Sequence, residues 1–439
     1  MKQRKLLVLG SDYCTHEIVL RAREMGLYVI AADLMQTSPT KQAAHEAWLL
    51  STNDLDGLER ACLEAGVDAV ICGASDFNIS NARLLCKRLG LPCHCEDDEV
   101  WEAVRSKRRF KALCRRCGAP VAEDYTVSDT PRPEELAQIR YPVVVKPSDK
   151  SGNRGMSYCD NEDELLKALQ LVKEVSNEAP IIERRLVGRE FNVHYALAAG
   201  EARLLYFSAT HHEPTALENL YSFKCTTTAG LKQFLREVDE ALRRVITAFG
   251  CREGVAWVDC MLDRDGSFYL LDFGHRLGGV MTYVPYEKIT GFDTLRWMLE
   301  CALGVRHKPE ELPSPELPFR QGCAASYHLF ALDAGPIARI EGLEELEAMP
   351  DLWIDLPKRE GSRLRPGACS GLLGIYGKDI YEICRALERV NACFRLLDGT
   401  GRQLYLQYHD TKALITEYET GIRETGGFAH EADANRSAL

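Results

Sequence analysis

Short apolar runs alternate with amphipathic stretches through the first hundred residues of the chain. The runs have strand length and the stretches have helix length, and they follow one another at residues 5–9, 14–25, 28–32, 54–64, 68–72 and 77–89. Strands that alternate with helices of about ten to fifteen residues form a parallel sheet covered on both faces. We therefore expect a Rossmann-like lobe at residues 1–103.

The pattern changes after residue 106. Ser106 can cap a helix over residues 107–117, and Gly118 can end it. Beyond this helix, longer strands are predicted, and a turn at residues 199–201 joins two of them as a hairpin. The expected strands are 141–146, 181–183, 191–198, 203–208 and the hairpin 255–273, and the expected helices are 231–249, 293–303 and 381–391.

Charge and length narrow the class of protein. The chain has 439 residues and a formal net charge of −11, from 54 basic and 65 acidic side chains. A negative total argues against nonspecific nucleic-acid binding, which needs a basic surface. The apolar run at residues 6–9 is too short for a signal-peptide core or a membrane span. We therefore expect a cytoplasmic protein with no nucleic-acid or membrane partner.

Seventeen cysteines are scattered through the predicted helices and strands. Free cysteine packs as a small hydrophobic residue, so buried thiols are expected. Cys93-His94-Cys95 falls in a short predicted strand, whose alternation would point neighbouring side chains to opposite faces. Cys114-x-x-Cys117 has no second pair at zinc-finger spacing. The cysteines therefore predict no metal site.

Two acids stand in the otherwise apolar strands on either side of Asp265-Gly266. This dipeptide favours a two-residue type I′ turn, and counting outward from it pairs Arg264 with Ser267 and Asp259 with Asp272. Directly opposed residues have Cβ atoms about 5 Å apart, so the two carboxylates would repel each other and lose solvation. A divalent cation removes both penalties, and paired oxygen ligands suit Mg²⁺ or Mn²⁺. A solvated acid pair at a strand edge is the alternative.

Two further segments have features of a nucleotide site. Lys146 ends a predicted strand, and the glycine-rich loop 151–155 follows it, so backbone N–H groups can close over phosphate beside a fixed positive charge. Glu183 ends another strand, and Glu190 opens the next after a glycine-containing turn, which can present backbone groups to adenine and a carboxylate to ribose. Each segment alone fits a ligand-free hairpin or surface turn equally well.

The order of these motifs resembles that of the ATP-grasp superfamily. Lys107, Lys146 with its glycine loop, Glu183 to Glu190, the aspartates and Arg276-Leu-Gly-Gly follow one another as in that family. The resemblance covers residues 1 to about 410 and is nearest to carboxylate–amine ligases and carbamoyl-phosphate-synthetase-like members. It implies an α/β and α+β fold. The implied parts are a Rossmann-like domain at 1–103, an ATP-grasp domain at 104–310 with a lid at about 120–188, a C-terminal lobe at 311–418 and a flexible tail at 419–439.

The resemblance also implies a role for each residue. Those that would contact or cover the phosphates are Lys107, Lys146, Ser151, Gly152 and Gly155. Those that would hold adenosine are Glu183, Arg184, Leu186 and Glu190. The metal ligands would be Asp259 and Asp272. Arg276 would bind the substrate carboxylate or the transferring phosphoryl group, and the adjacent His275 could act as general base for the amine. Side chains that could line the substrate pocket are His211, His212, Glu213, Tyr221 and Lys224.

The function implied is that of an ATP- and Mg²⁺-dependent ligase, which activates a small carboxylate as an acyl phosphate for attack by an amine. Members of the family often form homodimers. One departure concerns the metal shell: the family commonly has an asparagine two residues after the second metal ligand, where this chain has Gly274. Bicarbonate activation, and an ATP-binding protein with weakened catalysis, are therefore kept as alternatives. An NAD-dependent enzyme is disfavoured, because Gly10 lacks the two further glycines of the dinucleotide fingerprint, although Asp33 ends the second strand.

Overall fold

A computed structural model of the chain describes residues 3–128, 130–148, 155–176, 178–213, 220–319 and 322–425. Its first part is a parallel sheet with the strand order β3-β2-β1-β4. The strands are β1 (Lys5–Leu9), β2 (Tyr28–Asp33), β3 (Glu46–Leu49) and β4 (Ala69–Cys72), and the helices are α1 (Tyr13–Glu24), α2 (Pro39–Ala43), α3 (Leu55–Ala65) and α4 (Asp76–Leu89). The sequence pattern did not predict β3, because this four-residue edge strand alternates half-buried and exposed positions and has no apolar run.

The end of β2 does not present an acid to a ribose. Asp33 is only 5 % exposed, accepts a hydrogen bond from the Met35 N–H (2.6 Å) and forms a salt bridge with Lys41 (3.2 Å). Its carboxylate is therefore committed to the turn that leads into α2. This contact agrees with the expectation that the first lobe is not a dinucleotide site.

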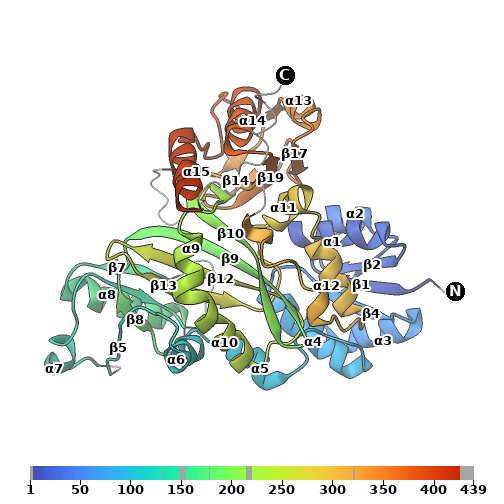
Figure 1. Cartoon of the computed structure of the whole chain (residues 1–439). Coiled ribbons are helices and arrows are strands. Elements are labelled where there is room, and N and C mark those ends of the chain that lie inside the picture. Colours follow the sequence, from blue (N-terminus) through green and yellow to red (C-terminus); the bar gives the residue numbers. More distant parts are fainter. Residues whose placement is uncertain are drawn as a thin grey trace.

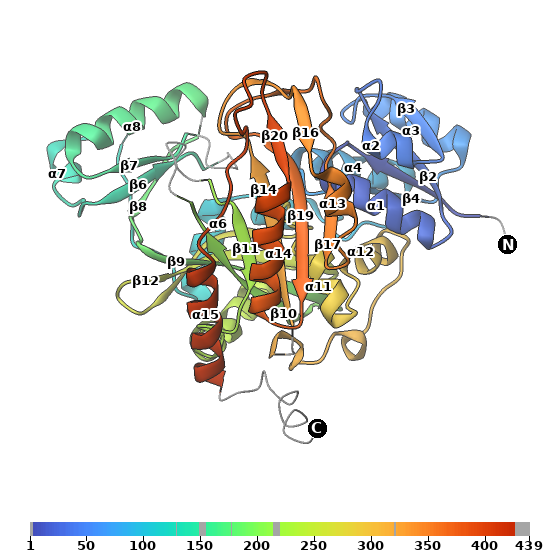
Figure 2. The same ribbon diagram turned by 90° about the horizontal axis from the view of Figure 1, so that it is seen from above.

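A second, smaller sheet has the strand order β5-β8-β6-β7 and lies at the opposite end of the molecule from the Rossmann-like lobe (Figures 1 and 2). Its strands are β5 (Asp124–Tyr125), β6 (Val143–Lys146), β7 (Ser157–Cys159) and β8 (Ile181–Arg184), and the nearby helices are α5 (Asp98–Val104), α6 (Lys107–Cys117), α7 (Pro133–Leu136) and α8 (Glu162–Val175). Leu165, Leu169 and Val172 of α8 pack in one apolar cluster with Val143 and Val145. This sheet occupies the segment where the lid was expected.

A mostly long-stranded antiparallel sheet connects the two ends. Its order is β13-β12-β9-β10-β11-β14-β19-β17. The strands are β9 (Gly188–Ala198), β10 (Glu201–His211), β11 (Phe223–Thr226), β12 (Gly254–Asp263), β13 (Phe268–Gly274), β14 (Cys323–Phe330), β17 (Leu352–Asp355) and β19 (Cys369–Gly377). Because β14 pairs with β11, the strands β14, β19 and β17 continue the sheet begun by β9 to β13. The other short strands after residue 310 pair with one another in two small separate sheets.

The remaining elements cover this sheet and its C-terminal extension, which lies between the two end lobes when seen from above (Figure 2). They are α9 (Leu231–Phe234), a π-helical turn (Leu235–Asp239), α10 (Glu240–Phe249), α11 (Tyr283–Thr290), α12 (Thr294–Ala302), β15 (Gly335–Pro336), β16 (Arg339–Glu341), α13 (Leu343–Glu347), β18 (Arg363–Leu364), α14 (Ile380–Cys393), β20 (Arg395–Leu397) and α15 (Thr411–Thr425). The expected start of a flexible tail at residue 419 is wrong, because α15 continues to Thr425. Its Glu424 accepts a hydrogen bond from the Gly230 N–H (2.6 Å).

The β12–β13 hairpin confirms the predicted pairing of Asp259 with Asp272 but corrects the turn. The Asp263 N–H donates to Ser267 O, and the Gly266 N–H donates to Asp263 O (both 3.0 Å), so the turn contains three residues. Pairing near the turn is therefore displaced by one residue from the prediction. A bulge that skips Leu271 restores the predicted register at the two aspartates.

None of the helices in the described part of the chain combines the length and the apolar composition that crossing a bilayer requires. All seventeen cysteines are free, and most are buried, as expected for packing thiols.

The hairpin turn depends on Gly266, which adopts a left-handed conformation (φ +81°) with open space around its Cα. Gly266→Ala should lower the free energy of unfolding by about 1 kcal/mol, because an L side chain is strained at this φ. Urea unfolding measures the change. Gly399→Ala, in open space at a turn without this φ, is the control and should change stability little. Equal losses in both variants would contradict the three-residue turn.

Candidate active site

The predicted nucleotide-site residues converge on one cavity of about 430 Å³. It is lined by the β5–β8 sheet and by the β9, β10, β12 and β13 strands of the large sheet. The predicted residues that line it are Lys107, Lys146, Glu183, Arg184, Leu186, Glu190, Asp259 and Asp272. Ser151 and Gly152 lie outside the described residues. The structure therefore brings together side chains that are up to 165 positions apart in the sequence.

Asp259 and Asp272 lie side by side at the inner wall of this cavity. Lys107 Nζ donates to Asp272 Oδ2 (2.8 Å), and Asn192 Nδ2 donates to Asp259 Oδ1 (2.7 Å). Burial raises the pKa of Asp259, and the neighbouring Asp272 carboxylate adds to this rise, although Lys224 and Asn192 oppose it. A carboxylate that is costly to keep ionised beside a second one fits a site for a hard divalent cation such as Mg²⁺.

Gly274 has a steric reason in this structure. It pairs with Trp257 across the hairpin, and a Cβ at Gly274 would lie 2.4 to 2.5 Å from atoms of the Trp257 indole. The space of the missing asparagine side chain is therefore filled by the indole ring. An amide is nevertheless present beside the two aspartates, because Asn192 on β9 pairs with Asp259. Asn192 Oδ1 in turn contacts His194 Nε2 (2.5 Å), which orients the amide.

Lys146 shares one carboxylate with a second lysine. Glu183 forms salt bridges with both Lys146 and Lys111, and it is only 5 % exposed. One negative charge cannot neutralise two buried cations. Burial and the nearby Lys111 lower the pKa of Lys146 to about 7, and burial lowers that of Lys111 to about 8. The site is thus ready for additional negative charge, which would restore full protonation of both lysines.

The carboxylate of Glu183 is therefore occupied by lysines and is poorly placed to bind adenine as predicted. The other two residues predicted to hold adenine lie differently. The Arg184 guanidinium donates to Asp263 (2.8 Å), whereas the Leu186 side chain lines the cavity. Glu190 lies against His212 (3.5 Å between Oε2 and Nε2). Burial opposes ionisation of Glu190, but His212 outweighs it and lowers the Glu190 pKa. An ionised Glu190 at the cavity wall is consistent with its predicted ribose contact.

The end of the glycine loop is tightly packed. Gly155 has a φ of +75°, and a Cβ there would lie 3.0 Å from both Pro147 and Val175. Next to it, Met156 and Tyr158 line the cavity. The β6–β7 hairpin thus forms one wall of the cavity and anchors both ends of the loop.

A second cavity of about 240 Å³ adjoins the first, and the two share Lys107, Tyr221, Asp259 and Asp272 as lining residues. Of these two cavities, Arg276 lines the second but not the first. Its Nε is 2.5 Å from Asp76 Oδ1 on α4, its Nη1 donates to Leu277 O (2.9 Å), and its guanidinium lies 4.9 Å from the centre of the Trp257 ring. These contacts hold a fixed cation beside the two aspartates.

His275 is not suited to be the predicted general base. It is 1 % exposed, and its Nε2 donates to the Glu253 carbonyl oxygen (2.8 Å). Burial lowers its pKa to about 3, so the ring is a weak base. The structure instead gives it a positioning role beneath the turn that carries Arg276.

The predicted alternation of His211 and His212 is confirmed. His212 lines the nucleotide cavity together with Tyr221 and Lys224, whereas His211 packs against Phe223 and Tyr408 on the other side. Glu213 accepts a hydrogen bond from the His409 N–H (2.6 Å) and so contacts the C-terminal region.

Lys111 and Asn192 are residues of this site that the sequence patterns did not predict. Lys111 follows Lys107 by one helical turn on α6, and Asn192 follows Glu190 by two residues on β9, so both spacings place the missed residue on the same face as a predicted one. The helical and strand periodicities could therefore have identified both residues from the sequence.

Asp259→Asn should raise the free energy of unfolding of the metal-free protein by roughly 1 kcal/mol, because a neutral amide is neither repelled by Asp272 nor costly to bury. The sign follows from the raised pKa of Asp259: the ionised group destabilises the fold at every pH above that pKa, and the cost is relieved as the pH falls through it. Thermal unfolding in EDTA and then in Mg²⁺ tests this. Mg²⁺ should raise the Tm of the wild type and of the control Glu64→Gln, at an exposed position of α3, but not that of Asp259→Asn. A less stable variant, or one that keeps the Mg²⁺ shift, would contradict the metal site.

Comparisons with known proteins agree with this geometry. Residues 139–284 match the ATP-grasp domain model. A biotin carboxylase of Halalkalibacterium halodurans is 26% identical over 362 residues, which span 75% of this chain and 75% of the relative.

Two solved structures show the same fold over most of the chain. The L-amino acid ligase from Bacillus licheniformis superimposes with a TM-score of 0.69 and 18% identity, over 90% of this chain and 99% of that one. The biotin carboxylase domain of 2-oxoglutarate carboxylase from Hydrogenobacter thermophilus, solved with MgADP and bicarbonate, gives a TM-score of 0.73 and 17% identity, over 98% and 99%. Residues 139–284 of this chain therefore form an ATP-grasp domain, within a chain that has the fold of the ATP-grasp enzymes.

Proposed function

We propose that this protein is an ATP-dependent ligase that activates a small carboxylate as an acyl phosphate and transfers the acyl group to an amine. One observation carries the proposal: the nucleotide cavity and the cavity of Arg276 meet at Asp259 and Asp272. A triphosphate and a carboxylate that entered from the two sides would meet at a metal held by these aspartates.

The nucleotide would lie along the 430 Å³ cavity. Lys146 and Lys107 would contact its phosphates, Glu190 its ribose, and the backbone near Leu186 its base. Glu183 would act indirectly, because its carboxylate holds Lys146 and Lys111 in place. Gly155 and the loop before it would cover the phosphates, and covering them excludes water.

Asp259 and Asp272 would hold Mg²⁺, with Asn192 next to them as the amide that Gly274 cannot provide. The metal would neutralise charge on the phosphates as the transferring group develops its negative charge. Lys107 Nζ lies 2.8 Å from Asp272 Oδ2. We expect it to move onto a phosphate oxygen when the metal takes that carboxylate.

The reaction follows from this placement. Arg276 would orient the substrate carboxylate, whose oxygen attacks the γ-phosphorus while the bond to the β-phosphate oxygen breaks and ADP leaves. The amine nitrogen then attacks the acyl carbon, inorganic phosphate leaves, and the nitrogen loses a proton to give an amide. A fixed Arg276 suits this role, because a guanidinium binds a carboxylate through two parallel hydrogen bonds.

Two assignments accompany this proposal. The protein would work in the cytoplasm, where MgATP is available, and it would act on small molecules as a monomer or homodimer. Bicarbonate activation is the second candidate, since the Hydrogenobacter structure with the same fold was solved with bicarbonate. The 240 Å³ cavity has room for more than bicarbonate, which favours a larger carboxylate here.

A phosphate-release screen with MgATP against amino acids, small carboxylates and bicarbonate should identify one carboxylate–amine pair that stimulates turnover. Lys146→Met and Asp272→Asn should each lower that turnover by about 100-fold or more, because each removes charge stabilisation of the transferring phosphoryl group. Lys232→Met, at an exposed position of α9, is the matched control and should keep full activity.

Three outcomes of this screen would contradict the ligase proposal. Release that needs bicarbonate alone would support the second candidate. ATP binding without release for any substrate would support a nucleotide-binding protein with lost catalysis. Unchanged turnover in both site variants would place the chemistry elsewhere.

Nucleotide binding should be coupled to proton uptake. Free Lys146, with a pKa of about 7, is mostly neutral at about pH 8, and a bound phosphate would raise its pKa so that it takes up a proton. Affinity for MgADP should therefore fall as the pH rises above about 7. Titration calorimetry in phosphate and in Tris buffer measures the uptake from the difference in apparent enthalpy. Lys146→Arg, which stays charged, should lose most of it, and an equal uptake in both proteins would refute the assignment.

A further inference from the structure

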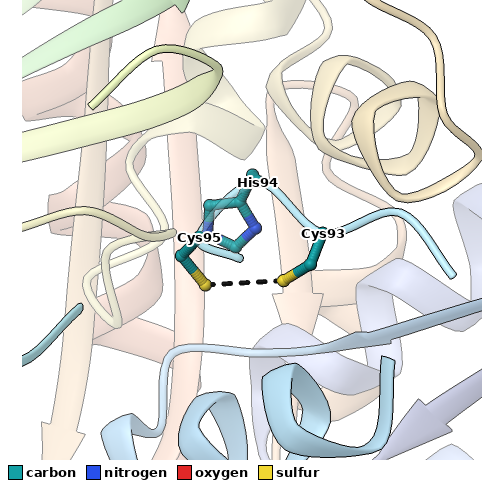
Figure 3. A group of neighbouring side chains, drawn as sticks. All are labelled: Cys93, His94 and Cys95. Carbon is teal, nitrogen blue, oxygen red and sulfur yellow. Dashed lines mark hydrogen bonds between the residues drawn. The ribbon is translucent and has the colours of Figure 1, made fainter. Parts of the chain in front are cut away.

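Three potential metal ligands meet in the segment between α4 and α5. Cys93 Sγ and Cys95 Sγ are 3.6 Å apart, and together with His94 they offer ligand atoms that all lie within 4.8 Å of one another. Figure 3 shows the two sulfur atoms turned toward each other with the His94 ring beside them. The expectation that alternation separates these side chains was wrong, because residues 93–95 form a turn and not a strand.

The distance between the sulfur atoms fits a shared metal ion. Two thiolates on one tetrahedral zinc, each with a Zn–S bond of about 2.3 Å, lie about 3.7 Å apart. A disulfide would need an oxidant and would leave the imidazole without a part in the cluster. The side-chain types, two thiols and one imidazole, are ligands that soft or borderline metals prefer.

A hydrogen bond to one ring nitrogen of His94 leaves the other nitrogen available to bind a metal. Its Nε2 lies 3.3 Å from the His275 carbonyl oxygen, and a carbonyl can only accept, so Nε2 carries the proton. The lone pair is then on Nδ1. Metal-bound histidines generally donate their other ring N–H to a carbonyl or carboxylate in this way. Gly254, at the start of β12, leaves room for the ring, because a Cβ there would lie 3.4 Å from atoms of His94.

Cys95 is buried, and Cys93 is half-buried. Metal binds cysteine as the thiolate, so a bound cation would supply the positive charge that two thiolates in this environment need.

We propose that Cys93, His94 and Cys95 form a site for a soft divalent metal ion of the zinc class. Binding would release the thiol protons of Cys93 and Cys95 to solvent, and no electron transfer is involved. The site is distinct from the aspartate pair, which offers oxygen ligands. It does not depend on the proposed ligase activity.

The position of this site connects it to the substrate cavity. His94 packs edge-on against His275, with ring centres 5.1 Å apart, and a small cavity nearby is lined by Cys93, His94 and Arg276. A metal that fixed His94 would therefore brace the turn that carries Arg276. Through His94, the metal would thus act on the turn that follows β13.

Titration of the full chain with Co²⁺, under reducing conditions and in excess Mg²⁺, tests the proposal. Tetrahedral thiolate-bound Co²⁺ gives intense visible bands and a sulfur-to-metal charge-transfer band, and one equivalent of Zn²⁺ should remove both. Cys93→Ser and His94→Gln should each weaken binding at least about tenfold. Glutamine can still donate to the His275 carbonyl, so His94→Gln removes a ligand and keeps that contact.

Two matched controls locate the metal. Cys117→Ser, at another half-buried cysteine, and Asp272→Asn, at the oxygen site, should both bind one equivalent as the wild type does. The proposal fails if the wild type shows no charge-transfer band, if His94→Gln binds as tightly as wild type, if only Asp272→Asn loses the metal, or if mass spectrometry of the reduced protein finds a Cys93–Cys95 disulfide. Circular dichroism verifies folding, and His94→Gln remains decisive if Cys93→Ser is unfolded.

Discussion

The close approach of the Asp259 and Asp272 carboxylates in the cavity wall is the constraint on which the rest of the site depends. Burial and the neighbouring Asp272 carboxylate raise the pKa of Asp259, so the ionised form of Asp259 costs free energy in the folded protein. Their position is fixed by the ladder of β12 and β13 and by the amide of Asn192 on β9. The surrounding cations, among them Lys107 and Lys224, reduce the cost but do not remove it. A protein keeps such a costly pair of acids where function requires it. A bound cation that carries a polyanion would offset the cost.

The lysines on the other side of the cavity have too little negative charge around them. Glu183 pairs with both Lys146 and Lys111, so the two lysines cannot both stay fully protonated beside one carboxylate. The acid pair lies on β12 and β13, whereas Lys146 lies on β6 and Lys111 on α6. In the function proposed above, a metal ion would add positive charge beside the aspartates and the phosphates would add negative charge beside the lysines.

The sequence predicted the two sheets and most of the site, because strand period and turn chemistry are local properties. The β12–β13 hairpin shows the value and the limit of such local signals. The predicted pairing of Asp259 with Asp272 is right, but the turn is one residue longer than predicted. A bulge at Leu271 cancels that error. Contacts that depend on tertiary packing were not accessible. The engagement of Glu183 by two lysines and the burial of His275 depend on how separate elements pack. The approach of Cys93 to Cys95 depends on a local turn where a strand was expected.

The unbroken hydrogen-bonded ladder from β13 to β17 limits how the molecule can move. A segment joined to the floor of the site through β11 and β14 cannot swing as a hinged flap without breaking strand pairs. Within the described residues, the small sheet of β5 to β8 is joined to that floor by the bridge between Val121 and Leu270 and by no longer strand ladder. For the nucleotide site proposed above, the small sheet is therefore the part that would open and close, and the C-terminal strands would form the wall against which it closes.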